Sequence, residues 1–330
     1  MKSIVDLIGN TPIIKLKKAS ELTGCNIFGK AEFLNPGLSI KDRAALSIIK
    51  EALNNNKLEQ GGTIVEGTAG NTGIGITMIA NYYGIKTIIV INKNQSQEKK
   101  DALINLGAKL IEVDPVPYAN PKNYVKYSKE VALDLAKKNK FKVCWANQFD
   151  NTINAQAHIE TTAQEIYGQL NGKIDAFTCS SGTGGTIAGV SIGLKEKNKN
   201  IKIFLSDPDG SSLCNYIKNG KLESYGSSIT EGIGASRISE NFKMAKIDDA
   251  FQISDKESLK ITFDLLKEEG LCLGSSSGVN VAGAIKLAKK IGKGKNIVTI
   301  LCDVGTRYSS KLYNVKFLKS KGLPYPDWIE

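Results

Sequence analysis

The sequence predicts an α/β fold in which parallel sheets are flanked by helices. Apolar, β-branched runs alternate along the chain with segments of helical periodicity. Gly84 and Gly107 stand where two expected helices end and the next expected strands begin, and glycine tolerates the left-handed conformation that closes a helix. The 330 residues are enough for two domains, or for one domain with an insertion. Alternation of this kind is typical of parallel sheets covered by helices.

The expected elements follow from periodicity and from turn residues. Short runs rich in β-branched residues predict strands at 63–66, 87–91, 109–113, 174–179, 202–205 and 296–301. Helical spacing of apolar residues predicts helices near 41–54, 71–83, 97–106, 124–139, 152–169, 184–194, 256–268 and 277–290. Three prolines between residues 114 and 123 predict a surface loop.

Composition narrows the class of protein. The net charge is +11, but the basic residues are spread along the chain and lack interleaved aromatics, so no nucleic-acid partner is expected. The apolar run 85–91 is too short to span a bilayer, and the N-terminus lacks a signal-peptide core. Six cysteines without metal-ligand spacing, and a single histidine, predict no metal site and a cytoplasmic protein.

Lys41 is the first candidate for chemistry. It lies in a loop of turn formers, residues 36–43, just before a helix-compatible run. A lysine in such a place can serve as an amine nucleophile toward an aldehyde cofactor. A solvated lysine at a helix start is the alternative, and residues 36–43 alone do not separate the two.

Two glycine-rich loops follow expected strands and open expected helices. Residues 182–186 (GTGGT) offer backbone N–H groups at a helix N-terminus, which suits a phosphate. The loop matches neither the dinucleotide fingerprint nor the P-loop. A tight turn is the alternative, but three glycines exceed what a turn needs. Residues 66–73 (EGTAGNTG) form the second of these loops and can present N–H groups and hydroxyls to a carboxylate. Within this loop, Asn71 can form a hydrogen bond with a ring hydroxyl.

A third motif, residues 274–278 (GSSSG), satisfies the G-x-S-x-G pattern of hydrolases. That interpretation fails because the one histidine, His158, precedes the serine, whereas hydrolases of that fold place histidine last. His158 is therefore expected to be a packed or capping residue.

Together these motifs resemble the cysteine synthase family, which comprises O-acetylserine sulfhydrylases and the cystathionine β-synthase core. The resemblance spans almost the whole chain, through residues 8–12 (IGNTP), 39–43 (SIKDR), 68–73, 148–149, 182–186, 274–278 and 303–308 (DVGTRY). It implies pyridoxal 5'-phosphate (PLP) as cofactor, a two-domain fold type II (tryptophan synthase β-like) architecture, and a homodimer. It also implies a larger domain of residues 1–37 and 146–330 and a smaller mobile domain of residues 38–145.

The resemblance implies a role for each matching residue. Lys41 would form the Schiff base with PLP and move the α-proton, Asn71 would bond the ring hydroxyl, and Ser276 would face the ring nitrogen. A serine there cannot hold the nitrogen protonated, which makes the ring a weaker electron sink. The phosphate would be bound by Gly182, Thr183, Gly184, Gly185 and Thr186. The substrate side would comprise Thr68, Ala69, Gly70, Thr72, Gln148 and Gly232.

The implied reaction starts from a β-substituted L-alanine. Loss of the β-substituent gives an α-aminoacrylate, to which a nucleophile then adds. The substrate loop is expected to close on the carboxylate and exclude water.

Two departures from the family pattern bear on the substrate. Ala69 stands where the family usually has serine, and Glu231 where it usually has glutamine. A carboxylate at 231 can act as a general base toward a weak nucleophile, unless it is merely an exposed acid. We therefore expect L-cysteine as donor with release of hydrogen sulfide. The acceptor would be cysteine (giving lanthionine), homocysteine or water. Cysteine synthesis from O-acetyl-L-serine and sulfide is the alternative.

Two further classes are weighed against this enzyme. Threonine dehydratases and threonine synthases share the fold, but their phosphate loops are typically richer in glycine. A catalytically silent binding protein is disfavoured because Lys41, Asn71, Gln148 and Ser276 occur together.

Overall fold

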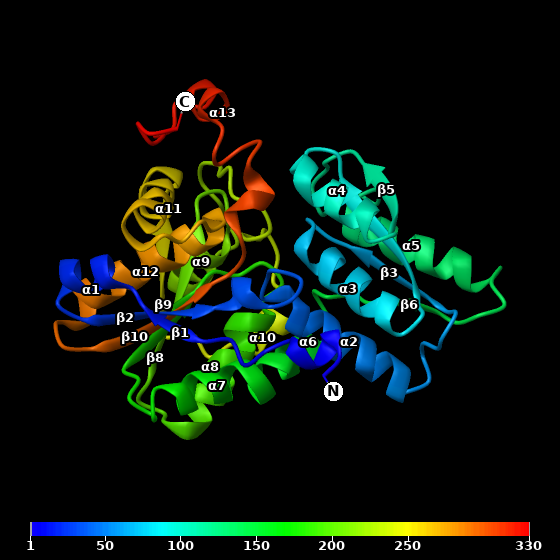
Figure 1. Ribbon diagram of the computed structural model, residues 1–330, viewed down its shortest axis with the longest axis horizontal. Coiled ribbons are helices and arrows are strands. Elements are labelled where there is room, and N and C mark those ends of the chain that lie inside the picture. Colours follow the sequence, from blue (N-terminus) through cyan, green and yellow to red (C-terminus); the bar gives the residue numbers. More distant parts are fainter. Residues whose placement is uncertain (1, 330) are drawn as a thin grey trace.

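The computed structural model describes residues 2–329, which form two parallel-type sheets with helices on both faces (Figure 1). The order in the larger sheet is β1-β2-β10-β7-β8-β9, and in the smaller sheet β5-β4-β3-β6. All neighbouring strands are parallel except β1, which runs antiparallel to β2. The larger sheet comprises β1 (Ile13–Lys15), β2 (Asn26–Ala31), β7 (Ala176–Cys179), β8 (Lys202–Pro208), β9 (Asp249–Ile253) and β10 (Asn296–Leu301). The smaller sheet comprises β3 (Thr63–Gly67), β4 (Lys86–Asn92), β5 (Lys109–Val113) and β6 (Val143–Trp145).

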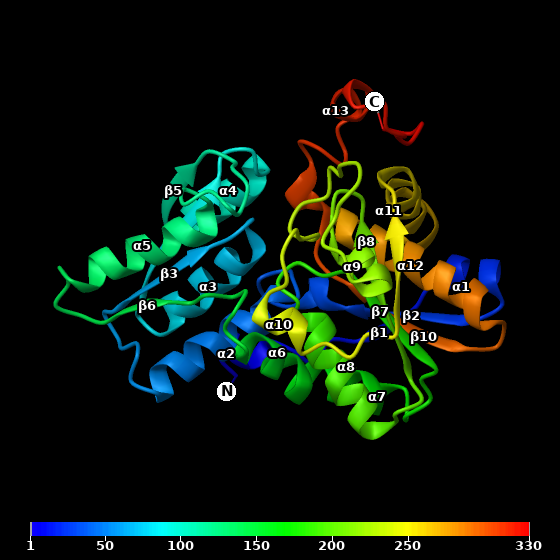
Figure 2. The ribbon, with the colours of Figure 1, turned by 180° about the vertical axis from the view of Figure 1, so that it is seen from behind.

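The helices cover both faces of each sheet, and Figure 2 shows them from behind. The α-helices are α1 (Lys17–Thr23), α2 (Lys41–Asn54), α3 (Asn71–Tyr82), α4 (Gln97–Asn105), α5 (Tyr124–Ala136), α6 (Ile153–Ala157), α7 (Ala163–Gln169), α8 (Gly185–Lys197), α9 (Leu213–Asn219), α10 (Glu240–Lys243), α11 (Asp255–Glu269), α12 (Ser275–Ile291) and α13 (Val315–Ser320). The 3₁₀ turns are η1 (Ile4–Leu7), η2 (Glu32–Leu34) and η4 (Gly305–Tyr308), and η3 (His158–Thr162) is a π-helix.

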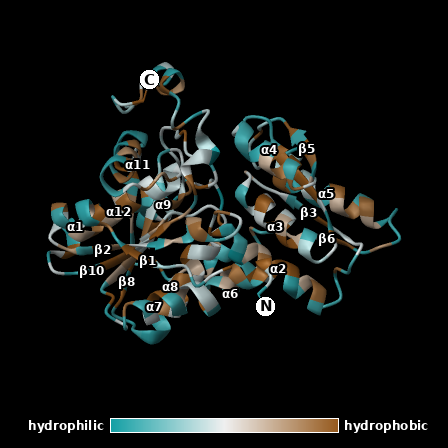
Figure 3. Cartoon of the chain, in the orientation of Figure 1, coloured by the Kyte–Doolittle hydropathy of each residue, from teal (hydrophilic) through white to brown (hydrophobic). Residues whose placement is uncertain are grey.

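Apolar packing explains why the helices lie where they do. Figure 3 shows hydrophobic residues concentrated in the strands. One face of the larger sheet packs on α8 through residues such as Ile187 and Val190, and the other packs on α12 through Val281 and Leu287. In the smaller sheet, α2 and α3 cover one face and α5 the other. Burial of these faces removes apolar surface from water and is the main stabilising term.

All four strands of the smaller sheet lie within residues 38–145, and all six of the larger sheet lie outside them. The expected movement of residues 38–145 as a separate unit stays a prediction. None of the described helices is long and apolar enough to cross a membrane. The expected parallel sheets are present, with the antiparallel edge strand β1 as an addition that the sequence did not predict.

Candidate active site

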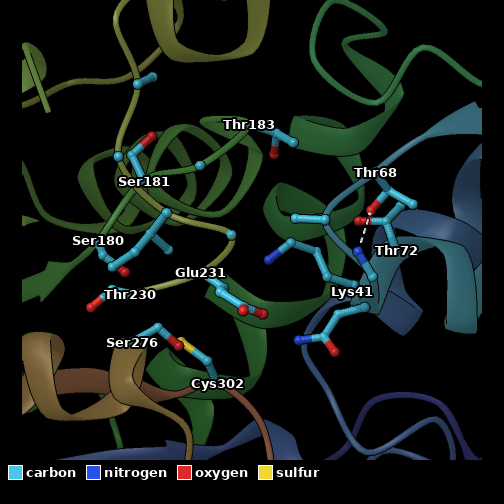
Figure 4. Close-up of a pocket in the computed structure, with 18 of the residues that line it drawn as sticks. Lys41, Thr68, Thr72, Ser180, Ser181, Thr183, Thr230, Glu231, Ser276 and Cys302 are labelled. Atoms are coloured by element: carbon cyan, nitrogen blue, oxygen red, sulfur yellow. Dashed lines mark hydrogen bonds between the residues drawn. The ribbon is translucent and has the colours of Figure 1, made fainter. Parts of the chain in front are cut away.

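A cavity of about 690 Å³ lies between the two sheets (Figure 4). Its lining includes the loops that follow β3, β7 and β10, so the carboxyl ends of three parallel strands contribute to it. In open α/β sheets this is where ligands bind. The predicted site residues that line it are Lys41, Thr68, Ala69, Gly70, Asn71, Thr72, Gln148, Gly182, Thr183, Gly184, Thr186, Glu231, Gly232 and Ser276. Gly185 lies behind the lining, packed against Asn154.

Lys41 is the first residue of α2, and a buried ion cluster holds the start of that helix. The guanidinium of Arg43, two residues on, donates to Glu32 at 2.7 Å and to Glu165 at 2.6 Å. Both acceptors belong to other elements of the chain, so the helix start is fixed from two sides. Lys41 is half-buried and lines the cavity. Figure 4 shows it on the side of Thr68 and Thr72, across from Ser180 and Ser181.

The loop between β7 and α8 has the features of an anion site. Gly184 has a φ of +89°, and a β-carbon there would lie 2.5 Å from the backbone nitrogen of Phe242. A β-carbon at Gly182 would overlap the carbonyl oxygen of Gly232. The loop therefore tolerates only glycine at these two positions and leads into a 13-residue helix, whose N-terminus attracts negative charge.

Two buried hydroxyls beside this loop are unpaired. Within residues 2–329, Ser181 Oγ and Thr230 Oγ1 have no hydrogen-bond partner. Both residues line the cavity. A buried hydroxyl without a partner is costly, so these two groups favour a bound polar ligand. Together with Lys41 and the glycine loop, they fit PLP.

The loop that follows β3 is tied to Gln148. Thr72 Oγ1 donates to Gln148 Oε1 at 2.6 Å, and Gln148 Nε2 donates to Glu66 Oε1 at 3.1 Å. The Gly70 amide donates to Thr68 Oγ1 at 3.1 Å (Figure 4). Burial raises the pKa of Glu66 to about 8, although its hydrogen bonds from the backbone and side chain of Gln148 work in the opposite direction. The loop is thus preformed with its polar groups at the cavity.

Two residues that sequence reasoning did not assign contact Asn71. Its Nδ2 donates to Asp303 Oδ2 at 2.6 Å, and its Oδ1 accepts from Arg307 Nη1 at 2.7 Å. One hydrogen of Nδ2 remains for a ligand. Both residues lie in the motif 303–308 that carried part of the resemblance, which was the available signal.

Cys302 is a second residue that the sequence did not single out. It lines the cavity beside Ser276 (Figure 4). Asn280 Nδ2 donates to its sulfur at 3.2 Å. Burial raises the pKa of the Cys302 thiol to about 11, so it is neutral at pH 7. No spacing pattern signalled it, because it follows a strand as an isolated cysteine.

Glu231 is buried, which corrects the alternative that it is an exposed acid. Its side chain is 7% exposed and lies 2.8 Å from Lys99 Nζ. It also pairs with Lys311 and accepts from Ser96 Oγ at 3.1 Å. Burial alone raises the pKa of Glu231, but Lys99 and Lys311 outweigh it and hold the pKa below its ordinary value. A carboxylate held in this way is a weaker base, which argues against a general-base role.

Comparison with known proteins defines the class. The family described as pyridoxal-phosphate dependent enzyme matches residues 4–303. The chain belongs to this family, and the predicted cofactor, PLP, is confirmed.

Relatives narrow the family further. Cysteine synthase 1 from Emericella nidulans is 48% identical over 328 residues, covering 98% of this chain and 87% of that protein. The O-acetylserine dependent cystathionine beta-synthase from Helicobacter pylori superposes with a TM-score of 0.85 at 35% identity, covering 94% of this chain and 98% of that one. A hydrogen sulfide-producing enzyme from Fusobacterium nucleatum gives a TM-score of 0.83 at 34% identity, covering 93% and 99%. The protein is therefore a PLP-dependent enzyme of the cysteine synthase family with the type II fold.

Proposed function

We propose that the protein makes L-cysteine by β-replacement, with sulfide displacing acetate from O-acetyl-L-serine. The observation that carries this is the likeness to cysteine synthase 1 over 98% of the chain. The cavity adds support, because it joins Lys41 to an anion-binding loop and to a preformed carboxylate loop. L-cysteine as donor, which the sequence favoured, takes second place.

The residues of the cavity divide the work. The backbone of residues 182–186 and the hydroxyls of Thr183 and Thr186 would hold the phosphate, with Ser276 and Asn71 at the ring. The cofactor, when bound, withdraws electrons from the substrate α-carbon and acidifies its proton. Lys41 Nζ removes that proton and returns it when the product forms.

The substrate carboxylate would lie on Thr68, Gly70 and Thr72, with Gln148 behind them. The Thr68 hydroxyl keeps its hydrogen for the carboxylate, whereas the Thr72 hydroxyl and the Gly70 amide would exchange their present acceptors, Gln148 and Thr68, for it. These hydrogen bonds would fix the α-carbon near Lys41. Ala69 and Gly232 would lie near the β-substituent. Closure of the smaller domain around this loop would exclude water.

L-cysteine as donor with release of sulfide is the second candidate, and two observations favour it. Ala69, which lines the cavity, departs from the pattern of the family that the sequence resembles. The solved structure from Fusobacterium nucleatum is that of a hydrogen sulfide-producing enzyme. Its acceptor would be cysteine, homocysteine or water.

Two parallel assays separate the candidates. Purified holoenzyme receives O-acetyl-L-serine with sulfide in one assay and L-cysteine alone in the other, and the amino-acid product and free sulfide are measured. We expect fast cysteine formation in the first and slow sulfide release in the second. Sulfide release from cysteine that outpaces cysteine synthesis would overturn the proposal. The Lys41→Ala variant should lose both activities and the visible absorption band of the bound cofactor.

A homodimer, a cytoplasmic location and movement of residues 38–145 stay predictions. Sedimentation of the holoenzyme would give the oligomeric state. A change in small-angle scattering on addition of an amino-acid substrate would report the movement.

A further inference from the structure

The single histidine lies directly beneath the phosphate loop. Glycines at 185, 189 and 193 recur every four residues and form one face of α8. A β-carbon at Gly189 would lie 2.5 Å from His158 Cβ, and one at Gly193 would lie 2.5 Å from Ala163 Cβ. Because no side chain fits between α8 and the helical segment 153–169, His158 comes within hydrogen-bond range of Thr186.

His158 opens the π-helix η3 and bridges two threonines. Its Nδ1 lies 2.8 Å from Thr162 Oγ1, and its Nε2 lies 3.3 Å from Thr186 Oγ1. His158 is 1% exposed and Thr162 is fully buried. π-Helical turns are rare in proteins, and those that occur are often found at functional sites.

The buried hydroxyl of Thr162 sets the direction of this chain of hydrogen bonds. Among residues 2–329, Nδ1 of His158 is the one partner of Thr162 Oγ1. A buried hydroxyl donates wherever an acceptor is available, so Nδ1 accepts and Nε2 carries the hydrogen. Nε2 then donates to Thr186 Oγ1, which leaves the hydrogen of the Thr186 hydroxyl free to point into the cavity.

Burial keeps the imidazole neutral, and the nearby Glu165 carboxylate opposes this effect without reversing it. Burial lowers the pKa of His158 well below its ordinary value, and the positive charges of Arg43 and Lys41 add to this effect. A neutral ring has one N–H and one acceptor nitrogen, which is the pattern that the two threonines require.

We propose that His158 is a positioning residue for the cofactor phosphate: it orients the Thr186 hydroxyl so that the hydroxyl donates to a phosphate oxygen. The contact acts through Thr186 and not on the substrate. The inference deepens the proposed function and depends on PLP in the cavity, but it does not depend on which amino acid reacts.

Nitrogen NMR of the wild-type holoenzyme tests the tautomer directly. The two nitrogens of a neutral imidazole resonate far apart, and the protein has one histidine, so the assignment is unambiguous. We expect hydrogen on Nε2 and a bare Nδ1, with the Nε2 signal moving when the cofactor is removed. Hydrogen on Nδ1, or signals that ignore the cofactor, would overturn the inference.

Two variants of His158 separate a positioning role from a packing role. In His158→Gln the amide nitrogen stands near the place of Nε2 and can still reach Thr186, whereas in His158→Asn it falls short. We expect His158→Gln to retain PLP nearly as well as the wild type. We expect His158→Asn to bind it on the order of tenfold more weakly, with an altered phosphorus NMR signal. Equal retention and equal phosphorus signals in the two variants would contradict the role.

Thr186→Ala and the double variant His158→Asn/Thr186→Ala complete a cycle. If His158 acts through Thr186, the double variant should bind PLP no more weakly than Thr186→Ala alone. Additive losses of PLP affinity would show that the two residues act independently and would contradict the proposal. These readouts are independent of cysteine synthesis: a wrong donor assignment leaves them unchanged, while a wrong role for His158 leaves the wild-type reaction unchanged.

Discussion

At position 184, backbone conformation and lack of space act together. Gly184 has a positive φ, and a β-carbon there would press on the backbone of Phe242, which a rotamer change cannot relieve. Gly107 has a φ of +88° with nothing within 4 Å of a β-carbon. An alanine would therefore be strained in its backbone at both positions, but only at 184 would its β-carbon also be crowded.

This pair gives a matched test. Gly107→Ala should cost about 1 kcal/mol of unfolding free energy and leave cofactor content unchanged. Gly184→Ala should cost about 1–3 kcal/mol more, because of overpacking, and should lose most of the bound PLP. Thermal unfolding and the visible absorbance of the purified proteins measure both effects. Full cofactor occupancy in Gly184→Ala would show that the loop relaxes without harm.

Glu66 makes stability depend on pH. Its pKa in the folded protein is about 8 because of burial, against an ordinary value of 4.5. The folded state thus favours the neutral acid. The stability that Glu66 contributes in this way is fully present below about pH 4.5 and is lost as the pH rises through about 8.

Glu66→Gln should remove this loss, because an amide mimics the neutral acid beside Gln148. We expect the variant to match the wild type in melting temperature at pH 5 and to exceed it by several degrees at pH 9. Glu196→Gln, at an exposed position, is the control. A constant difference across this pH range would mean that Glu66 does not titrate as described.

At the scale of elements, local pattern predicted the long strands and helices but missed β1, β2, β6 and β9. Two of these, β1 and β6, have only three residues. β2 contains Lys30, which is fully buried because it pairs with Glu165 at 2.6 Å, and Gly29, which leaves room for Leu301. A lysine and a glycine do not favour a buried strand in the sequence, and only their partners in the fold explain why they are there.

The expected helix at 152–169 is a single segment in sequence terms, yet it contains the π-helix His158–Thr162. That turn packs closely on α8 at Gly189, a contact that no local pattern encodes. Periodicity alone therefore gave the helical segment but not the π-turn.

Helix α2 carries Lys41, and its start depends on a buried arginine. Arg43 donates through its fork to Glu32 and Glu165, whose side chains are 0% and 13% exposed. Removing one partner of a buried ion pair leaves the other charges uncompensated, which is strongly destabilising.

Arg43→Met should lower the unfolding free energy by about 3–5 kcal/mol, and Arg43→Lys by less, because lysine keeps the charge but loses the fork. The exposed pair Lys260–Asp264 offers a control, since Lys260→Met should cost no more than about 0.5 kcal/mol. Urea unfolding compares all three. A similar small loss in every variant would mean that water replaces the cluster.

Across the whole molecule, polar contacts beside the cavity link residues 94–99 to segments far away in sequence. Lys311 Nζ donates to the carbonyl of Asn94 at 2.9 Å, and the Ser310 amide donates to Glu98 at 2.6 Å. The Lys99–Glu231 pair joins positions 132 residues apart in sequence. The sequence singled out Glu231 as unusual for its family, but its partners are visible only when distant segments come together. The sequence indicated a base role because a carboxylate can accept a proton, but it did not show that Lys99 and Lys311 lie beside this carboxylate.

The ion pair and the base role predict different behaviour of one double variant. Glu231→Leu alone leaves the Lys99 ammonium, 2% exposed, without its carboxylate and should cost about 3 kcal/mol. Lys99→Met alone should cost less, because Glu231 keeps its ion pair with Lys311. The combined Lys99→Met/Glu231→Leu variant removes the buried pair and leaves unpaired only Lys311, whose side chain is 23% exposed, so it should recover most of the melting temperature that Glu231→Leu loses. If Glu231 acts by holding Lys99 and Lys311 together, both half-reactions should recover together in the double variant, in rapid-mixing experiments with the donor and then the nucleophile. If Glu231 is a general base, the second half-reaction should stay slow while stability recovers, because no apolar side chain accepts a proton.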